Sequence, residues 1–226
     1  MPESTLLLVF YRSSFSKHYI RILDKNMYGL PQTTEIKKQL PKKAIYAKFE
    51  LDAQQRDSLD ADINRLDLTA FISPATVPAI SEGQTVKEFY LMCVRLKRKE
   101  YNAKNIVLLS RLISQNIVFA LQYEDETQLA VFHTKLISSC WKPTDETRID
   151  LSGLNLEAVW ENIIKQVGQI DVEEGRSLTE QIQADEKKVK IEAQIKTLER
   201  RLATEKQPRK KRECFEMIRK LKESIN

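Results

Sequence analysis

Two matching apolar patterns near the C-terminus constrain the fold more than any other feature of the chain. Each contains four residues separated by four, three and four positions, which is the spacing of one face of an α-helix. Their members are Ile191, Ile195, Leu198 and Leu202, and then Cys214, Ile218, Leu221 and Ile225. We predict an antiparallel helical hairpin over residues 172–226 that turns near Pro208. Its facing pairs are Leu202 with Cys214, Leu198 with Ile218, Ile195 with Leu221, and Ile191 with Ile225.

Cationic side chains gather where this hairpin is predicted to turn. They are Arg200, Arg201, Lys206, Arg209, Lys210, Lys211 and Arg212, which we call the basic turn. A run of like charges is commonly only a solvated helix end, but it also suits the backbone of a nucleic acid or an acidic protein face. The apolar stripe of two helices offsets too little of the conformational entropy lost on folding for the hairpin to stand alone. We therefore expect it to dock on the rest of the chain, to pair with a second copy or to bind a partner.

The net charge of +5 is spread unevenly along the chain. Residues 1–50 contain nine Lys and Arg against four Asp and Glu, and residues 172–226 contain fifteen against eleven, so the middle is mildly acidic. The first basic region contains a second candidate surface for a nucleic acid or a partner, made of Lys37, Lys38, Lys42, Lys43 and Lys48. Ile45 and Phe49 lie there at helical spacing, which favours a segment that packs into the core instead.

The part of the chain before the hairpin mixes strand and helix patterns. We predict strands at residues 66–72, 86–96, 117–123, 128–133 and 137–141, with a further short strand at residues 6–11. Helices are expected at residues 53–64, 101–114 and 156–167, the first capped by Asp52 and the last by Asn155. The nearly continuous apolar strand at 86–96 should lie centrally in its sheet. The fold class is therefore α+β, a mixed or antiparallel sheet packed with helices, with residues 1–26 as a possible N-terminal extension, 27–171 as the body and 172–226 as the hairpin.

Composition argues against several classes of protein. Only five glycines are present, which argues against a Gly-rich phosphate loop. The three cysteines, Cys93, Cys140 and Cys214, lie far apart, which argues against a zinc site and a disulfide framework. The apolar run at residues 6–10 is too short to span a membrane and follows Glu3 rather than a basic segment. We expect a cytoplasmic protein with no cofactor, no metal site and no membrane association.

A divalent-metal nuclease is the enzymatic alternative. A restriction-type site needs carboxylates and a lysine on neighbouring strands, to hold the ion and orient a water molecule. Asp67 lies on one predicted strand, and Glu88 and Lys97 lie on or beside the next, so these three are the candidate catalytic residues. The second strand has Cys93 and Arg95 where another carboxylate would be required. The set is incomplete, and the sequence favours a binding protein over an enzyme.

Several short stretches, in a fixed order, carry a family resemblance. They are residues 29–31 with Thr34 and Lys37, residues 40–43, the predicted strand pair of residues 117–133, residues 153–156 leading to residues 159–162, and the charged C-terminal hairpin. Together they resemble a bacterial family catalogued as domain of unknown function forty-three ninety-one, from Met27 to the end. Trp160 stands where tyrosine is expected. Arg95 stands where relatives often have an acidic residue, which weakens the nuclease alternative further.

The resemblance implies a role but no chemistry. Members tend to sit beside DNA methyltransferases and helicases in restriction-like or anti-phage gene clusters, and the family brings no catalytic residues. We therefore expect a non-enzymatic accessory protein of a DNA modification, restriction or anti-phage system. It would bind a larger helicase or methyltransferase partner, and possibly DNA, through the basic turn. A homo-oligomerisation module whose hairpin pairs with its own copy is a further alternative.

Overall fold

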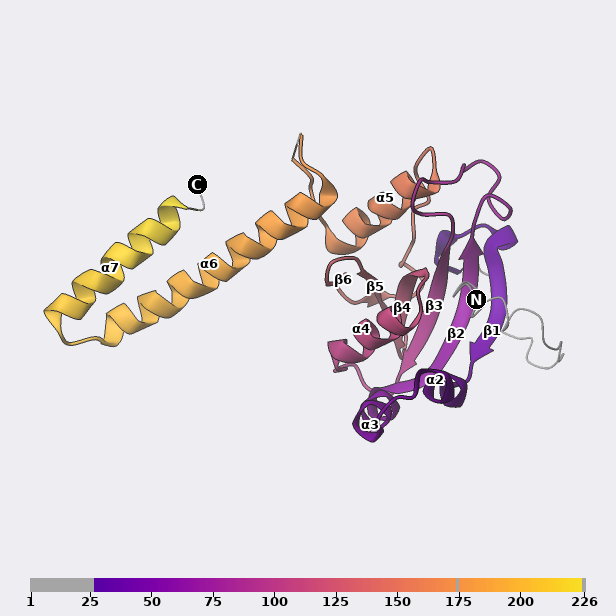
Figure 1. Cartoon of the computed structure of the whole chain (residues 1–226), viewed down its shortest axis with the longest axis horizontal. Helices are drawn as coiled ribbons and strands as arrows, with labels where there is room; N and C mark the ends of the chain where they lie inside the picture. The colour runs from indigo at the N-terminus through magenta and orange to yellow at the C-terminus, as the bar shows by residue number, and fades with distance from the viewer. Residues whose placement is uncertain (1–26, 174, 225–226) are drawn as a thin grey trace. The chain divides into compact units, whose positions relative to one another are not determined.

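The structure, a computed structural model, describes residues 27–173 and 175–224 (Figure 1). The chain divides into two compact units, the first ending at Gln169 and the second beginning at Ile170. The division predicted between residues 171 and 172 lies slightly further along the chain. The predicted extension at residues 1–26, with its expected strand, lies outside the described residues. Within the described ranges, none of the helices combines the length and apolar character needed to cross a bilayer.

A mixed sheet of seven strands forms the centre of the first unit, preceded by two short 3₁₀ helices at Met27–Gly29 and Gln32–Thr34. Its strands are β1 (Glu35–Leu40), β2 (Ile63–Ile72), β3 (Phe89–Leu96), β4 (Asn116–Tyr123), β5 (Glu126–Phe132), β6 (Leu136–Ser138) and β7 (Lys142–Pro143). The first six lie across the sheet in chain order, and β7 pairs with β5. All pairs are antiparallel except β3 with β4. This is the mixed α+β fold that the sequence predicts.

The parallel pair β3–β4 occupies the middle of the sheet. Helix α4 (Ala103–Leu112) connects the two strands, as a parallel pair requires. Every residue of β3 except Arg95 is buried, which confirms that this apolar strand lies centrally and is covered on both faces. A turn at Glu124 and Asp125 then joins β4 to β5, so the strand pair predicted over residues 117–133 is formed.

Three helices pack on one face of the sheet, which we call the first face. They are α2 (Lys42–Phe49), α3 (Ala53–Asp62) and α4, and their core contacts include Ile45, Leu59, Ile106 and Leu109 against Leu66, Met92 and Phe119 of the strands. The predicted cap of α3 is confirmed. The Asp52 carboxylate accepts a hydrogen bond from the Gln55 amide at 2.7 Å, and the Gln55 side chain accepts one from the Asp52 amide at 3.2 Å.

A buried carboxylate lies where α3 passes directly into β2. Asp62 Oδ1 accepts hydrogen bonds from Arg98 Nη2 at 2.7 Å and Nε at 3.1 Å. Asp62 Oδ2 accepts them from the Asn102 amide at 2.7 Å and from Asn105 Nδ2 at 2.8 Å. Burial raises the pKa of this carboxyl, but the Asn102 amide, Arg98 and Asn105 together outweigh that effect and hold it below its usual range. The network ties the end of α3 to the first turn of α4.

Helix α5 (Leu156–Gly168) covers part of the opposite, second face of the sheet. The Asn155 side chain accepts a hydrogen bond from the Ala158 amide at 2.9 Å, which confirms the predicted cap. The Trp160 and Phe89 rings lie 5.5 Å apart between centroids, so the aromatic residue of the family pattern packs in the core. The helix extends one residue beyond the predicted 156–167, to Gly168, and Gln169 takes the left-handed conformation that ends it.

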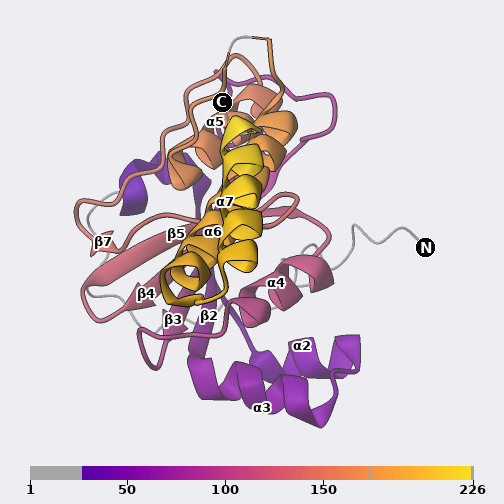
Figure 2. The same cartoon turned by 90° about the vertical axis from the view of Figure 1, so that its left-hand side faces the viewer.

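The second unit is a helical hairpin, as predicted. Helix α6 (Leu178–Thr204) begins at a capping box between Ser177 and Glu180, and α7 (Pro208–Glu223) begins at Pro208. The two helices run side by side (Figure 2). Ile195, Cys214 and Ile218 are buried between them, and a 3.0 Å ion pair joins Lys222 Nζ to Glu199. The predicted pair of Ile191 with Ile225 lies partly outside the described residues.

Several element boundaries differ from those predicted. Strand β1 was not predicted, because it is an edge strand in which Ile36 and Leu40 are the residues that join the hydrophobic core. Helix α2 was indicated only by the helical spacing of Ile45 and Phe49, without bounds. The helix predicted over residues 53–64 ends at Asp62, since β2 begins at Ile63. Strand β3 begins at Phe89 rather than at residue 86. In place of one strand at residues 137–141 there are two short ones, β6 and β7.

Candidate binding surfaces

The basic turn is assembled by the tight connection between α6 and α7. Residues 205–207 join the two helices, and Pro208 occupies the first turn of α7, where a residue without an N–H leaves no bond unmade. Arg200 and Arg201 lie in the last turns of α6, Lys206 lies in the connection, and the run from Arg209 to Arg212 follows Pro208. All seven side chains belong to exposed residues. The hairpin therefore brings together every cation that the sequence assigned to this surface.

The run from Arg209 to Arg212 lies at the end of α7 that already carries positive partial charge. The first turn of the helix contains no acidic residue, and cations at a helix N-terminus are typically unfavourable by about 0.3–1 kcal/mol each. Arg209 and Arg212 each pair with a glutamate one turn later, at 3.3 Å to Glu213 and Glu216. Their side chains are nevertheless 93% and 84% exposed. The cations thus weaken the helix slightly and strengthen a site for an anion.

Glu205 stabilises the connection between α6 and α7. Its Oε1 accepts hydrogen bonds from the amides of Gln207 and Lys206, both at 3.0 Å. The Gln207 amide, then the Lys206 amide and the charges of Lys210 and Arg201, hold the pKa of this carboxyl below its usual value. The carboxylate therefore orders the backbone just before α7.

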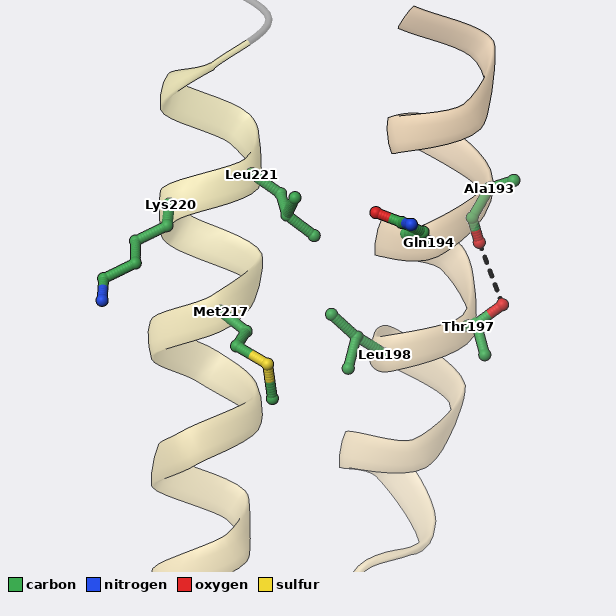
Figure 3. A pocket seen from close by; sticks show the side chains of 7 residues that line it. All are labelled: Ala193, Gln194, Thr197, Leu198, Met217, Lys220 and Leu221. Carbon is green, nitrogen blue, oxygen red and sulfur yellow. Dashed lines mark hydrogen bonds between the residues drawn. The ribbon is translucent and has the colours of Figure 1, made fainter. Parts of the chain in front are cut away.

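An open groove of about 670 Å³ lies between the two helices (Figure 3). Ala193, Gln194, Thr197 and Leu198 line it from α6, and Met217, Lys220 and Leu221 line it from α7. Leu198, Met217 and Leu221 point toward one another across it, and the Thr197 hydroxyl is already bonded to the Ala193 carbonyl at 2.9 Å. Sequence reasoning missed this groove, although Met217, one residue before Ile218 of the buried stripe, was a visible signal.

The lysines of the second basic set are spread over β1 and α2. Lys37 pairs with Glu35 at 3.3 Å, and Lys42 Nζ bonds to the Asp60 carboxylate and to the Ile63 carbonyl at 2.9 Å. Lys38 lies in β1 opposite Leu68, and Lys43 is exposed at the start of α2. Ile45 is buried in the core, in line with the interpretation of this segment as a core-packing helix. Lys42 therefore has a structural partner, and Lys43 is the exposed cation of this helix start.

The three candidate catalytic residues do not meet. The Glu88 carboxylate accepts a hydrogen bond from Tyr90, whose ring belongs to the core of the first face. Asp67 lies opposite Cys93 in β3, and Glu88 is five residues before Cys93. Five residues span about 17 Å along an extended chain, so Glu88 is far from Asp67. The Lys97 side-chain amine donates to the Asp60 backbone carbonyl, and the Lys97 backbone amide donates to the Asp62 carbonyl at 2.8 Å. The arrangement of Asp67, Glu88 and Lys97 considered from the sequence is therefore not formed.

Asp67 instead lies beside Arg65 and Arg95 on the second face of the sheet, and we call these three residues the Asp67 row. Asp67 lies opposite Cys93 in β3, and its carboxylate pairs with Arg65 Nε at 2.7 Å and with Arg95 Nε at 3.9 Å. One carboxylate between two arginines is a poor divalent-metal site, because both cations repel the ion. Among residues 27–173 and 175–224, no group of three or more His, Cys, Asp and Glu is placed to hold a metal.

The Cys93 thiol next to Asp67 is held in a buried hydrogen-bond chain. It donates to Gln122 Oε1 at 2.9 Å, and Gln122 Nε2 donates to the Tyr28 hydroxyl at 2.6 Å. Burial raises the pKa of Cys93 to about 12, and the charge of Arg95 offsets only part of that effect. The thiol is therefore protonated at neutral pH and is not a nucleophile. Sequence reasoning placed Cys93 in an apolar pattern, and the structure agrees.

Comparison with known proteins adds a family but no activity. No curated protein and no solved structure matches this chain. The model of one family, described as a domain of unknown function (DUF4391), matches residues 28–225. That match covers all the described strands and helices from β1 to α7. The chain therefore belongs to the DUF4391 family.

Proposed function

We propose that this chain is a non-enzymatic accessory protein whose C-terminal hairpin binds a polyanion, with DNA as the first candidate, through the basic turn. The observation that carries the proposal is the run of cations from Arg209 to Arg212 at the exposed N-terminus of α7. The restriction or anti-phage association that the family resemblance implies, with a helicase or DNA methyltransferase partner in the cytoplasm, is part of the same proposal.

The basic turn combines two sources of positive potential, the N-terminus of α7 and the cationic side chains. The unpaired amides at the start of α7 and the neighbouring side chains all favour an anion, and phosphate groups are the anions that such helix ends commonly bind. Because the cations are exposed, they keep most of their hydration until an anion displaces it. If four of them contact phosphates, the logarithm of affinity should fall with the logarithm of salt concentration at a slope of about −3.6.

The sharpest test changes charge without removing a helix contact. Lys210→Glu with Lys211→Glu leaves the Arg209–Glu213 and Arg212–Glu216 pairs intact. It also places carboxylates where the helix dipole favours them. We expect duplex DNA binding, measured by fluorescence anisotropy, to be lost while the circular dichroism spectrum is unchanged. Reversal of all four residues from Arg209 to Arg212 should have the same effect.

Lys187→Glu with Lys188→Glu is the matched control. It makes the same change in net charge on exposed residues of α6, about 25 Å from the end of that helix. Binding that is lost equally in both double variants would show only a general charge effect. Binding that is unchanged in the Lys210 and Lys211 variant would remove the basic turn from the proposal.

Two other functions make different predictions. A nuclease would cleave phage DNA in the presence of Mg²⁺, and the Asp67→Ala variant would lose that cleavage. An oligomerisation module would show a mass in light scattering that falls to that of one chain on dilution. The paired state of Asp67 with Arg65 and Arg95 makes the nuclease the weaker of the two.

A further inference from the structure

The hairpin has a second surface, chemically unlike the basic turn. The groove between α6 and α7 is lined by apolar side chains at its centre, namely Leu198, Met217 and Leu221. Met217 is 46% exposed, so its side chain is accessible from the groove. Methionine adapts its shape to a partner at low cost and is over-represented at binding surfaces. A groove of this kind between two helices matches the mode in which a third helix lays its apolar face into a hydrophobic groove.

Cations flank the groove on both helices. Lys220 lines it directly. Lys190 precedes Gln194 by four residues and Arg201 follows Thr197 by four, so both lie on the helix face of the lining residues. Lys210 precedes Met217 by two helical turns and lies on the same side.

The acidic residues beside this line on α7 are already neutralised. Glu216 directly precedes Met217, and its carboxylate pairs with Arg212 at 3.3 Å. Glu213 precedes Met217 by four residues, and its carboxylate pairs with Arg209 at 3.3 Å. The ion pair that crosses the hairpin, between Lys222 and Glu199, involves residues that do not line the groove. The edges of the groove therefore present a surplus of positive charge.

This charge selects among possible occupants. A second copy of the hairpin would bring the same cations against one another, and like charges facing each other across an interface are unfavourable. DNA offers no apolar stripe to fill the space around Met217. An amphipathic helix with Asp and Glu beside its apolar stripe satisfies both the apolar centre and the cationic edges.

We infer that the groove between α6 and α7 binds an amphipathic helix of a partner protein whose apolar stripe is flanked by acidic residues. The inference deepens the proposed function, because it rests on the hairpin being a binding element and names the chemistry of its protein partner. The groove adjoins the basic turn, and Arg201 and Lys210 belong to both, so one hairpin contacts DNA at its turn and a partner helix along its side.

The test uses designed peptides and the full chain. The probe is a fluorescein-labelled peptide of three heptads with Leu at the a and d positions and Glu at the e and g positions. A matched peptide carries Lys in place of Glu. We expect saturable binding of the Glu peptide, measured by anisotropy, at least about tenfold tighter than that of the Lys peptide. Equal binding of the two peptides, or no binding of either, would overturn the inference.

A matched pair of variants then places the peptide on the protein. Met217→Glu puts a charge into the groove, whereas Phe215→Glu makes the same change at another exposed apolar residue of α7 that does not line it. Met217→Glu should weaken peptide binding about tenfold or more, and Phe215→Glu less than about twofold. Equal effects of both variants would refute the placement.

A last comparison separates this inference from the proposed function. Met217→Glu leaves every cation of the basic turn in place, so its affinity for duplex DNA should stay within about twofold of the unchanged chain. Peptide binding without DNA binding would support the groove and remove the proposed DNA contact. A chain that dimerises, and whose Met217→Glu variant is monomeric in light scattering, would show that a second copy occupies the groove and would overturn the inference.

Discussion

The buried Asp62 network gives the most quantitative prediction for the stability of the first unit. In the Asp62→Ala variant the Asn102 amide and one Asn105 hydrogen lose their acceptor, and each buried unsatisfied donor costs about 1–3 kcal/mol. Asn105 keeps its second bond, at 3.0 Å to the Ser58 carbonyl. Arg98 adds little because its side chain is 60% exposed and reaches water. The two donors together would cost about 2–6 kcal/mol, and because Asn105 keeps one bond we expect the lower part of that range, a loss of about 2–4 kcal/mol in the free energy of unfolding.

Urea unfolding followed by tryptophan fluorescence measures this loss. Both tryptophans, Trp141 and Trp160, lie in the first unit, so the signal does not report on the hairpin. With a urea dependence of about 2 kcal/mol per molar, the middle of the usual range, the midpoint should fall by roughly 1–2 M. Asp57→Ala removes an exposed carboxylate from the same helix and should change stability by less than about 0.5 kcal/mol.

Acid provides an independent check on the same residue. The folded pKa of Asp62 is lowered, so its contribution is fully present above the unfolded pKa of about 3.9 and is lost as pH falls through the lower folded value. The difference between the unchanged chain and Asp62→Ala should therefore be constant near neutral pH and shrink in acid below about pH 4. A difference in unfolding free energy that is equally large in acid would refute the reasoning, as would an equal loss of stability in the Asp57→Ala variant.

Three further predictions concern other parts of the chain. A thiol reagent at pH 8 should modify exposed Cys140 rapidly and Cys93 only on unfolding, because burial raises the pKa of Cys93 to about 12; fast modification at both would contradict the buried chain to Gln122. Ile218→Ala should weaken the hairpin by about 2–4 kcal/mol, lowering helical ellipticity while tryptophan fluorescence is unchanged. Glu157→Ala should speed hydrogen exchange at the Thr85 and Val86 amides, which now donate to this carboxylate at 2.8 and 3.0 Å, and unchanged exchange would show that the contact is not maintained.

Periodicity predicted those parts of the fold whose burial follows a simple geometric rule. The two apolar stripes with Ile195 and Ile218 led to the hairpin, because a two-helix seam needs only a repeat of four and three residues. Strand β3 was found because it is apolar on both faces. Strand β1 was missed because an edge strand buries few side chains, and most of its residues are polar.

The candidate sites also differ in how far the sequence could predict them. The basic turn is contiguous in sequence, so its assembly needed only the position of the turn, which Pro208 marked. The Asp67 row depends on strand register, since Cys93 lies opposite Asp67 only through the β2–β3 pairing, and the pairing is interrupted by bulges. The groove depends on how two helices pack, and no spacing or motif in the sequence shows that Leu198 and Met217 line the same groove.

The local character of the hairpin has a kinetic consequence. The residues that close it, such as Ile195 and Ile218, are separated by a short stretch of chain, and helical proteins with such local contacts fold within microseconds to milliseconds. The sheet must instead bring together β3 and β4 across a whole crossover, which is slow to nucleate. We therefore expect the hairpin to open and re-form faster than the sheet does. The amide hydrogens of the hairpin should therefore exchange with solvent faster than those of β3 and β4. A ligand that binds the hairpin would be detected first as slowed hydrogen exchange in α6 and α7.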